Sequence, residues 1–277
     1  MATIPQFTHI RVLRAKINVK LSKQAFRWGL ENELVPTEVT QAICLVRGLK
    51  KGRSKARDPV EIQPVSDEIV EKTLTHLPSI VADMVRVQRL CGMRPQDVTN
   101  LRSCDIDRSQ KIWKYTPFTH KNKHRGKRRE LAVGPRAQAI LTPYLIEKET
   151  TPESFLFSPR DTLRLQKIEK RQKRKTFNKK GQVQPSQQDR SKPNPKRKPR
   201  EQYDKNSYCR AVKRACKKAG VESWSPNQLR HSAGTRVRDE YGLEYAQAVL
   251  GHSSAKTTEI YAKVNFEKAA AVMEEIG

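Results

Sequence analysis

The sequence predicts a mainly helical α+β protein with one small antiparallel β-hairpin. Two observations support this fold class. Over most of the chain, apolar residues recur at intervals of three and four between residues that start and stop helices. One stretch, Lys111 to Phe118, instead alternates bulky and polar residues, and Arg129 to Val133 does so more weakly. We therefore expect helices throughout, with residues 119–126 as the tip of the hairpin.

Composition limits the class of partner. The chain has 277 residues, with 56 Lys and Arg against 29 Asp and Glu, a net charge of +27. Such an excess favours a polyanion, nucleic acid ahead of an anionic membrane surface. No apolar run reaches the length of a membrane span, and the first residues lack the apolar core of a secretory signal. We expect a cytoplasmic protein without a membrane partner.

Metal and disulfide sites are not expected. The five cysteines form no CxxC pair, and an odd number argues against a disulfide framework. His120 and His124 have half of a zinc spacing but no matching cysteine pair. We therefore predict no cofactor.

Residues 8–57 predict two helices separated by Pro36. Their apolar sets are Ile17, Leu21, Ala25 and Trp28, then Val39, Ile43, Leu45 and Val46. The cationic, glycine-broken run from Arg47 to Arg57 is either a linker that touches phosphates or a solvated connector. Its candidate DNA-binding residues are Lys50, Lys51 and Arg53.

A second helical region begins at Ser66, where Asp67 and Glu68 supply acid in the first turn. Apolar spacing from Ile69 to Cys91 supports two helices broken near Pro78. Gly92 then ends a helix, and Arg94 stands just before a new one whose Val98 and Leu101 face inward.

Beyond the hairpin, Gly134 and Pro135 start a helix, and residues 155–157 form a short buried segment. Residues 160–201 carry sixteen Lys and Arg against four Asp and Glu and are almost without apolar residues after Phe177. This composition predicts a disordered or partly helical insertion. A helix follows over 203–220, and Trp224 packs beneath the next one.

The last quarter of the chain is suited to an anion. Ser225 and Pro226 start a helix. Asn227, Arg230 and His231 share one face near its positive end. Gly242 breaks this helix, Leu243–Leu250 forms another, and residues 251–254 interrupt the chain before the segment that carries Tyr261.

These motifs resemble those of the tyrosine recombinases, or phage integrases. The resemblance rests on Gln228–His231, Leu250–Ser253, Thr257–Tyr261 and the box Gly92–Val98. It implies a helical catalytic domain that cleaves and rejoins DNA through a 3′-phosphotyrosyl intermediate. One lysine of the hairpin tip acts at the leaving oxygen in this family, and Thr119–Asn122 is the best match.

The resemblance implies a role for each matching residue. Tyr261 is the nucleophile, Arg94 and Arg230 bind the phosphate, and Asp97 supports the Arg94 guanidinium. His252 bonds a non-bridging oxygen or holds the tyrosine. Lys121 protonates the leaving oxygen, with Lys123 as the second choice. Lys123 and Arg125 are further DNA-binding candidates of the tip.

One position departs from the family pattern. Where the family usually has His or Lys, this chain has Asn227, an amide that cannot act as a base. Water, the phosphate or His231 must then take the Tyr261 proton, and the enzyme is slow or inactive. The alternatives are a non-catalytic DNA-binding protein derived from a recombinase and, more weakly, an RNA-binding protein.

The domain prediction follows from the same resemblance. Residues 1–57 are expected to be a shortened core-binding segment that clasps DNA, which suggests an incomplete N-terminus. Residues 58–65 form a linker and 66–277 the catalytic domain. We expect action on double-stranded recombination sites, as a homotetramer, at the nucleoid.

Overall fold

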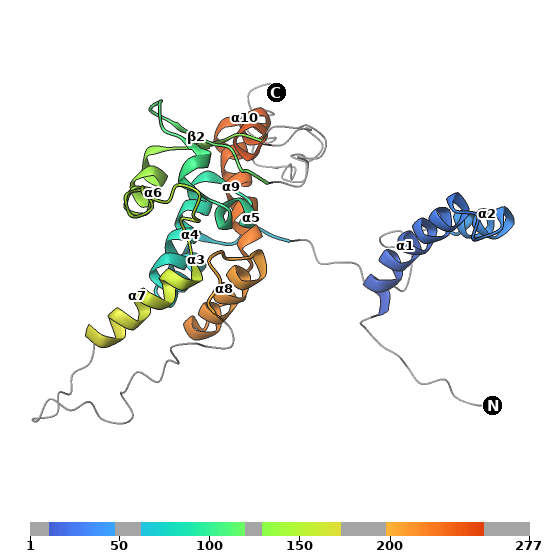
Figure 1. The fold of residues 1–277 in the computed structure, drawn as a ribbon, viewed down its shortest axis with the longest axis horizontal. Coiled ribbons are helices and arrows are strands. Elements are labelled where there is room, and N and C mark those ends of the chain that lie inside the picture. The colour runs from blue at the N-terminus through green and yellow to red at the C-terminus, as the bar shows by residue number, and fades with distance from the viewer. Residues whose placement is uncertain (1–10, 48–61, 120–128, 173–197, 252–277) are drawn as a thin grey trace, which may run out of the picture. The chain divides into compact units, whose positions relative to one another are not determined.

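The computed structural model describes residues 11–47, 62–119, 129–172 and 198–251. The chain divides into two compact units, Met1–Ile62 and Gln63–Gly277. The described residues are mostly helical and include one three-stranded antiparallel sheet (Figure 1). The predicted fold class is confirmed.

The first unit is a pair of helices, α1 (Arg11–Glu31) and α2 (Thr37–Leu45), with Pro36 at the start of α2 as predicted. The Lys23 ammonium donates to the Cys44 carbonyl over 2.8 Å and so ties the two helices together. On the predicted apolar face of α1, Leu21 and Trp28 are 54% and 60% exposed, so the two helices bury little of it by themselves.

In the second unit, α3 (Asp67–Leu74) begins as predicted, with the Ser66 hydroxyl accepting from the Ile69 N–H. Helix α4 (Ser79–Cys91) follows Pro78 and ends at Gly92, whose φ of 62° is left-handed. Glycine adopts that conformation at little cost. The chain can therefore turn sharply into Arg94 and the short α5 (Pro95–Thr99).

The sheet contains the predicted hairpin and one strand that the sequence did not reveal. Strands β2 (Trp113–Tyr115) and β3 (Leu131–Val133) pair antiparallel, with Tyr115 opposite Leu131. Strand β1 (Ile106–Asp107) adds to the other edge of β2 after a 3₁₀ turn over Ser103–Asp105. Two residues are too few to show an alternating pattern, so β1 could not be predicted.

Helix α6 (Pro135–Glu147) starts where predicted, and α7 (Pro159–Gln172) lies within the predicted insertion. The helical alternative therefore holds for this part of residues 160–201. Contacts at its N-terminal end attach α7 to the unit. Asp161 pairs with Lys148 at 2.9 Å, and the Thr162 hydroxyl accepts from Tyr203 at 2.8 Å.

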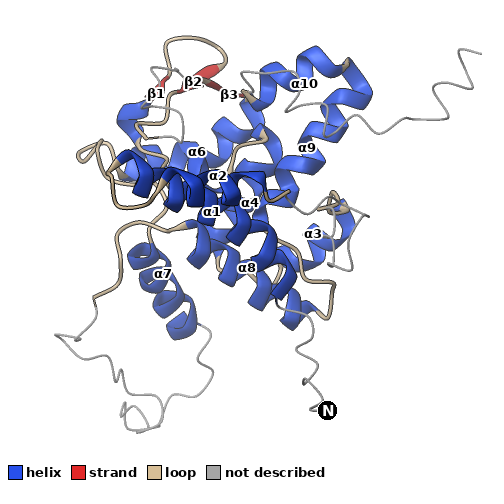
Figure 2. Ribbon diagram, turned by 90° about the vertical axis from the view of Figure 1, so that its right-hand side faces the viewer, coloured by secondary structure: helices blue, strands red, loops and turns tan. Residues whose placement is uncertain are grey.

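The remaining helices are α8 (Lys205–Ala219), α9 (Pro226–Tyr241) and α10 (Leu243–Leu250). Trp224, two residues before α9, is buried and donates its indole N–H to Thr73 of α3 over 3.0 Å. The sheet and α10 lie at one end of the unit, and the free ends of α7 and α8 at the other (Figures 1 and 2).

Helix α4 runs through the middle of this unit and supplies much of the core, including Val81, Met84, Val85 and Val87 at 1% exposure or less. Its buried Gln88 donates to the carbonyls of Met93 and Pro226 and accepts from the Tyr208 hydroxyl. One amide thus fixes α4, α8, α9 and the turn before Arg94 together. Among the described helices, none is both long and apolar enough to cross a bilayer.

Candidate active site

Arg94 stands at the N-cap of α5 in an extended conformation, directly after the turn at Gly92 and the buried Met93. Its side chain is half-buried. Its backbone carbonyl accepts from the Asp97 and Val98 N–H groups, and its own N–H donates to the Asp97 carboxylate over 3.0 Å. The start of α5 therefore fixes where the Arg94 side chain leaves the backbone.

Arg230 is buried in α9, at 4% exposure. Its two terminal nitrogens each donate over 2.7 Å to a backbone carbonyl, one to Gly92 and the other to Leu250. Gly92 stands two residues before Arg94, and Leu250 two residues before His252. Arg230 therefore joins the segments that lead into two other predicted site residues.

Asn227 and His231 contact each other one turn apart on α9. The Asn227 amide nitrogen lies 3.1 Å from His231 Nε2. Because an amide nitrogen only donates, Nε2 accepts and the ring proton sits on Nδ1. Burial, reinforced by the neighbouring Arg230 charge, lowers the pKa of His231 below its ordinary value. The imidazole is therefore held neutral at pH 7.

The Asp97 carboxylate has partners that the sequence did not suggest. We expected it to support the Arg94 guanidinium. Among the described residues, it accepts instead from the Arg94 backbone N–H and, over 2.8 Å, from Arg129. Arg129 lies just before β3 and is itself buried. The motif thus fixes the Arg94 backbone rather than its side chain.

Other predicted residues lie outside the described part of the chain. This applies to the catalytic candidates Lys121, His252 and Tyr261 and to the DNA-binding candidates Lys50, Lys51, Arg53, Lys123 and Arg125. The structure brings Arg94, Asp97, Asn227, Arg230 and His231 into one region, and the chain leaves that region at Gly251, one residue before His252.

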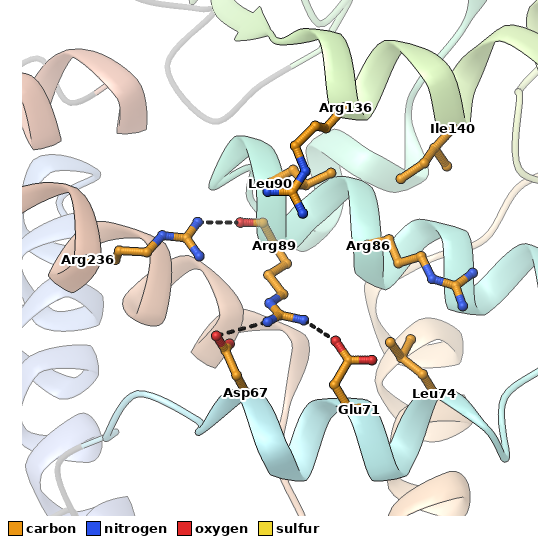
Figure 3. Close-up of a pocket in the computed structure, with 9 residues that line it drawn as sticks. All are labelled: Asp67, Glu71, Leu74, Arg86, Arg89, Leu90, Arg136, Ile140 and Arg236. Atoms are coloured by element: carbon orange, nitrogen blue, oxygen red, sulfur yellow. Dashed lines mark hydrogen bonds and ion pairs between the residues drawn. The ribbon is translucent and has the colours of Figure 1, made fainter.

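A cavity of about 480 Å³ lies between α3, α4, α6 and α9 (Figure 3). None of the predicted site residues lines it. Arg89 bonds Asp67 at 2.9 Å and Glu71 at 2.6 Å, and its carbonyl accepts from Arg236 at 3.4 Å. These contacts join α3, α4 and α9 behind the candidate site.

A basic face on α8 was missed by sequence reasoning, which identified only the apolar stripe of this helix. Tyr208, Val212 and Cys216 are buried, and the helix contains no acidic residue. The exposed cations on its other side are Lys205, Arg210, Lys213, Arg214, Lys217 and Lys218. Counting charge separately for each predicted helix would have revealed this face.

The chain is similar in sequence to proteins of one family. The model of the phage integrase family matches residues 66–268, which include all the motifs of the catalytic candidates. A tyrosine recombinase XerC from Bifidobacterium longum subsp. infantis is 48% identical over 58 residues, 21% of this chain and 16% of that protein. The chain therefore matches less than a quarter of the length of this relative.

Solved structures share the fold. A lambda integrase dimer bound to a COC′ core site superposes with a TM-score of 0.57 at 14% identity, over 91% of this chain and 60% of that chain. A lambda integrase tetramer bound to a Holliday junction gives 0.54 at 14% identity, over 90% and 59%. At such identity the likeness concerns the fold alone.

Proposed function

This chain belongs to the phage integrase family, and from that premise we propose that it is a site-specific DNA recombinase of the tyrosine type. It cleaves and rejoins strands through a 3′-phosphotyrosyl intermediate. The proposal is carried by one observation: the buried Arg230 donates to both Gly92 and Leu250, and so gathers the segments of Arg94 and His252 around one guanidinium.

The chemistry follows from the residue types at these positions. The Tyr261 oxygen attacks the phosphorus of a DNA phosphodiester and takes the 3′ end, while the bond to the 5′ oxygen breaks. That oxygen leaves with a proton supplied by Lys121. Arg94 and Arg230 stabilise the charge that builds on the non-bridging oxygens, because a guanidinium stays charged and presents several donors. Rejoining reverses these steps without ATP or metal.

Because Asn227 cannot act as a base, we assign that role to His231, one turn along α9. Its pKa is lowered by burial and by Arg230, so the ring is neutral and able to accept a proton at pH 7. The Asn227 amide contacts Nε2 and fixes the ring orientation. In this proposal Asn227 orients the ring, and the Tyr261 proton goes to Nε2, the unprotonated nitrogen, as the Asn227 amide gives up its hydrogen bond there.

The DNA partner and the domain roles belong to the same proposal. Residues 66–277 act as the catalytic domain, 1–57 clasp the DNA, and 58–65 connect them. The exposed cations of α8 bind phosphates. Assembly as a tetramer on DNA is proposed by analogy with the lambda integrase tetramer bound to a Holliday junction. A place at the nucleoid is proposed because the substrate is DNA.

A nicked suicide substrate tests the activity, because loss of a short fragment beyond the nick traps the covalent complex. We expect a protein–DNA species on a denaturing gel with the native chain and none with Tyr261→Phe. Absence of the species with the native chain would reject the enzymatic proposal. Its persistence in Tyr261→Phe would remove that residue from the role of nucleophile.

A second candidate function is DNA binding without catalysis, and Asn227 is the observation that favours it. This candidate predicts salt-sensitive DNA binding and no covalent species from the native chain. If Asn227→His then produced the covalent species, the native chain would be a recombinase that has lost its base. His231→Gln should instead abolish trapping if His231 acts as proposed above.

A further inference from the structure

The structure joins the two segments of the candidate site a second time, through Arg129. One terminal nitrogen of its guanidinium donates to the Asp97 carboxylate over 2.8 Å, and the other reaches the Gly251 carbonyl at 3.4 Å. The same Asp97 oxygen accepts from the Arg94 backbone N–H. Arg129 therefore spans from the start of α5 to the end of α10.

The environment of this side chain is dry and constrained. The side chains of Arg129 and Asp97 are 5% and 4% exposed. The Tyr115 hydroxyl of β2 donates to the Asp97 carbonyl over 2.9 Å and holds the same residue against the sheet. A buried guanidinium held between the start of α5 and the end of α10 has little freedom to move.

Stability alone is a poor explanation for this pair. Burying two charges costs nearly as much as their attraction returns, and apolar side chains of similar volume are often as stable. Burial lowers the pKa of Arg129, and Nε has no hydrogen-bond partner among the described residues. Because this ion pair leaves a buried donor unsatisfied, we infer that its role is to fix the positions of the segments it joins.

We propose that Arg129 is a positioning residue for strand cleavage: through Asp97 and Gly251 it sets the distance between the start of α5, which carries Arg94, and the end of α10 at Gly251. Arg129 does not touch the DNA in this proposal. It determines whether the two predicted phosphate contacts reach the same phosphorus. The inference rests on the proposed recombinase function for its rate effect, but the bridge itself can be tested without activity.

The rate test uses single-turnover formation of the covalent complex on the suicide substrate. Arg129→Lys keeps a charge beside Asp97 but loses the planar fork that reaches both partners. We expect its rate at saturating protein to fall about a hundredfold, as displacements near 1 Å can cause. The protein concentration that gives half-maximal rate should stay within about twofold of the native value.

A matched control separates positioning from general stability. Lys148→Gln removes the ion pair with Asp161, whose side chains are 17% and 16% exposed and which links α6 to α7. We expect a lower unfolding temperature from this variant, with a native rate of cleavage. If Lys148→Gln slowed cleavage as much as Arg129→Lys, or if Arg129→Lys cleaved at the native rate, the inference would be overturned.

Hydrogen exchange tests the bridge independently of catalysis. In Arg129→Lys, amides of residues 92–98 and 246–251 should exchange at least about fivefold faster than in the native chain, both segments together. Lys148→Gln should leave both unchanged. If the native chain traps no DNA, the proposed function fails and exchange alone decides the inference. Native exchange in either segment of Arg129→Lys would overturn it.

Discussion

At the scale of single residues, the arginines of this chain have two different uses. Among the described arginines, only Arg129 and Arg230 are buried, and each hydrogen-bonds to backbone or to an acid that itself binds backbone. Arg94 is half-buried at the start of α5. The buried pair holds the segments of the site together, and in our proposal Arg230 also meets the phosphate, together with Arg94.

His231 should respond to acid in a defined direction. Its pKa in the folded protein is lowered from 6.5 by burial and by Arg230. The unfolded chain therefore takes up the proton first as pH falls, and stability drops below about pH 6.5 until the folded pKa is passed. Nuclear magnetic resonance titration of the His231 ring should give a midpoint below 6.5. A midpoint above 6.5 would contradict the burial argument.

The cysteines should differ in reactivity. Burial raises the pKa of Cys91 to about 12, and Cys216 is fully buried, whereas Cys104 is exposed. Because the thiolate is the reactive form, iodoacetamide at pH 8 should alkylate Cys104 and spare Cys91 and Cys216. Urea should make both reactive. Mass spectrometry of the peptides measures this, and early labelling of Cys91 would show that α4 opens readily.

At the scale of elements, helix ends determine the site more than helix interiors do. Gly92 ends α4, Gly251 ends α10, and both carbonyls accept hydrogen bonds from buried arginines. The turn at Gly92 is also packed, since an added Cβ would lie 3.0 Å from Leu250 and 3.4 Å from Ala233. Gly220, after α8, also has a left-handed backbone conformation, but a Cβ added there would have no atom within 4 Å.

These two glycines form a matched pair of substitutions. Gly220→Ala should cost about 1–2 kcal/mol, the ordinary penalty of a left-handed residue with a Cβ. Gly92→Ala carries the same penalty plus about 1–3 kcal/mol for crowding of the core. Urea denaturation of both variants measures the difference. Equal losses would mean that Leu250 and Ala233 move aside without cost.

The helices and the hairpin could be predicted because their signals are local. Ser66, Pro78, Gly92, Gly220 and Gly242 mark the helix ends where the structure has them. Strand β1 was missed because two residues carry no pattern. The apolar face of α1 was predicted from its spacing, but spacing says nothing about whether a partner surface covers it, and Leu21 and Trp28 are exposed.

At the scale of the whole molecule, the distribution of charge bears on the proposed DNA binding. The net charge of +27 is spread over both units, and α8 presents six exposed cations with no acid among them. Phosphate contacts by such residues release counterions and make binding depend on salt. The basic face of α8 should therefore contribute to the salt dependence more than cations already paired on the surface.

A charge-matched pair of variants tests this face. Lys213→Gln on α8 should reduce the slope of log affinity against log salt by about 1. Lys72→Gln removes the same charge from α3, where Lys72 pairs with Glu68 at 2.7 Å, and should leave the slope nearly unchanged. Fluorescence anisotropy measures the affinity of each variant for duplex DNA at salt concentrations from about 50 to about 200 mM. Equal slopes for the two variants would remove α8 from the DNA interface.

The sequence by itself determined the mainly helical class, the hairpin, most helix ends and the family resemblance, because capping, turn chemistry and short motifs act over a few residues. The tertiary structure alone decided which cations are buried. Nothing in Lys127–Arg128–Arg129 tells the three apart, yet Arg129 lies against Asp97 from 32 positions earlier. The partners of a side chain are set by how distant segments pack, and that packing depends on the whole fold.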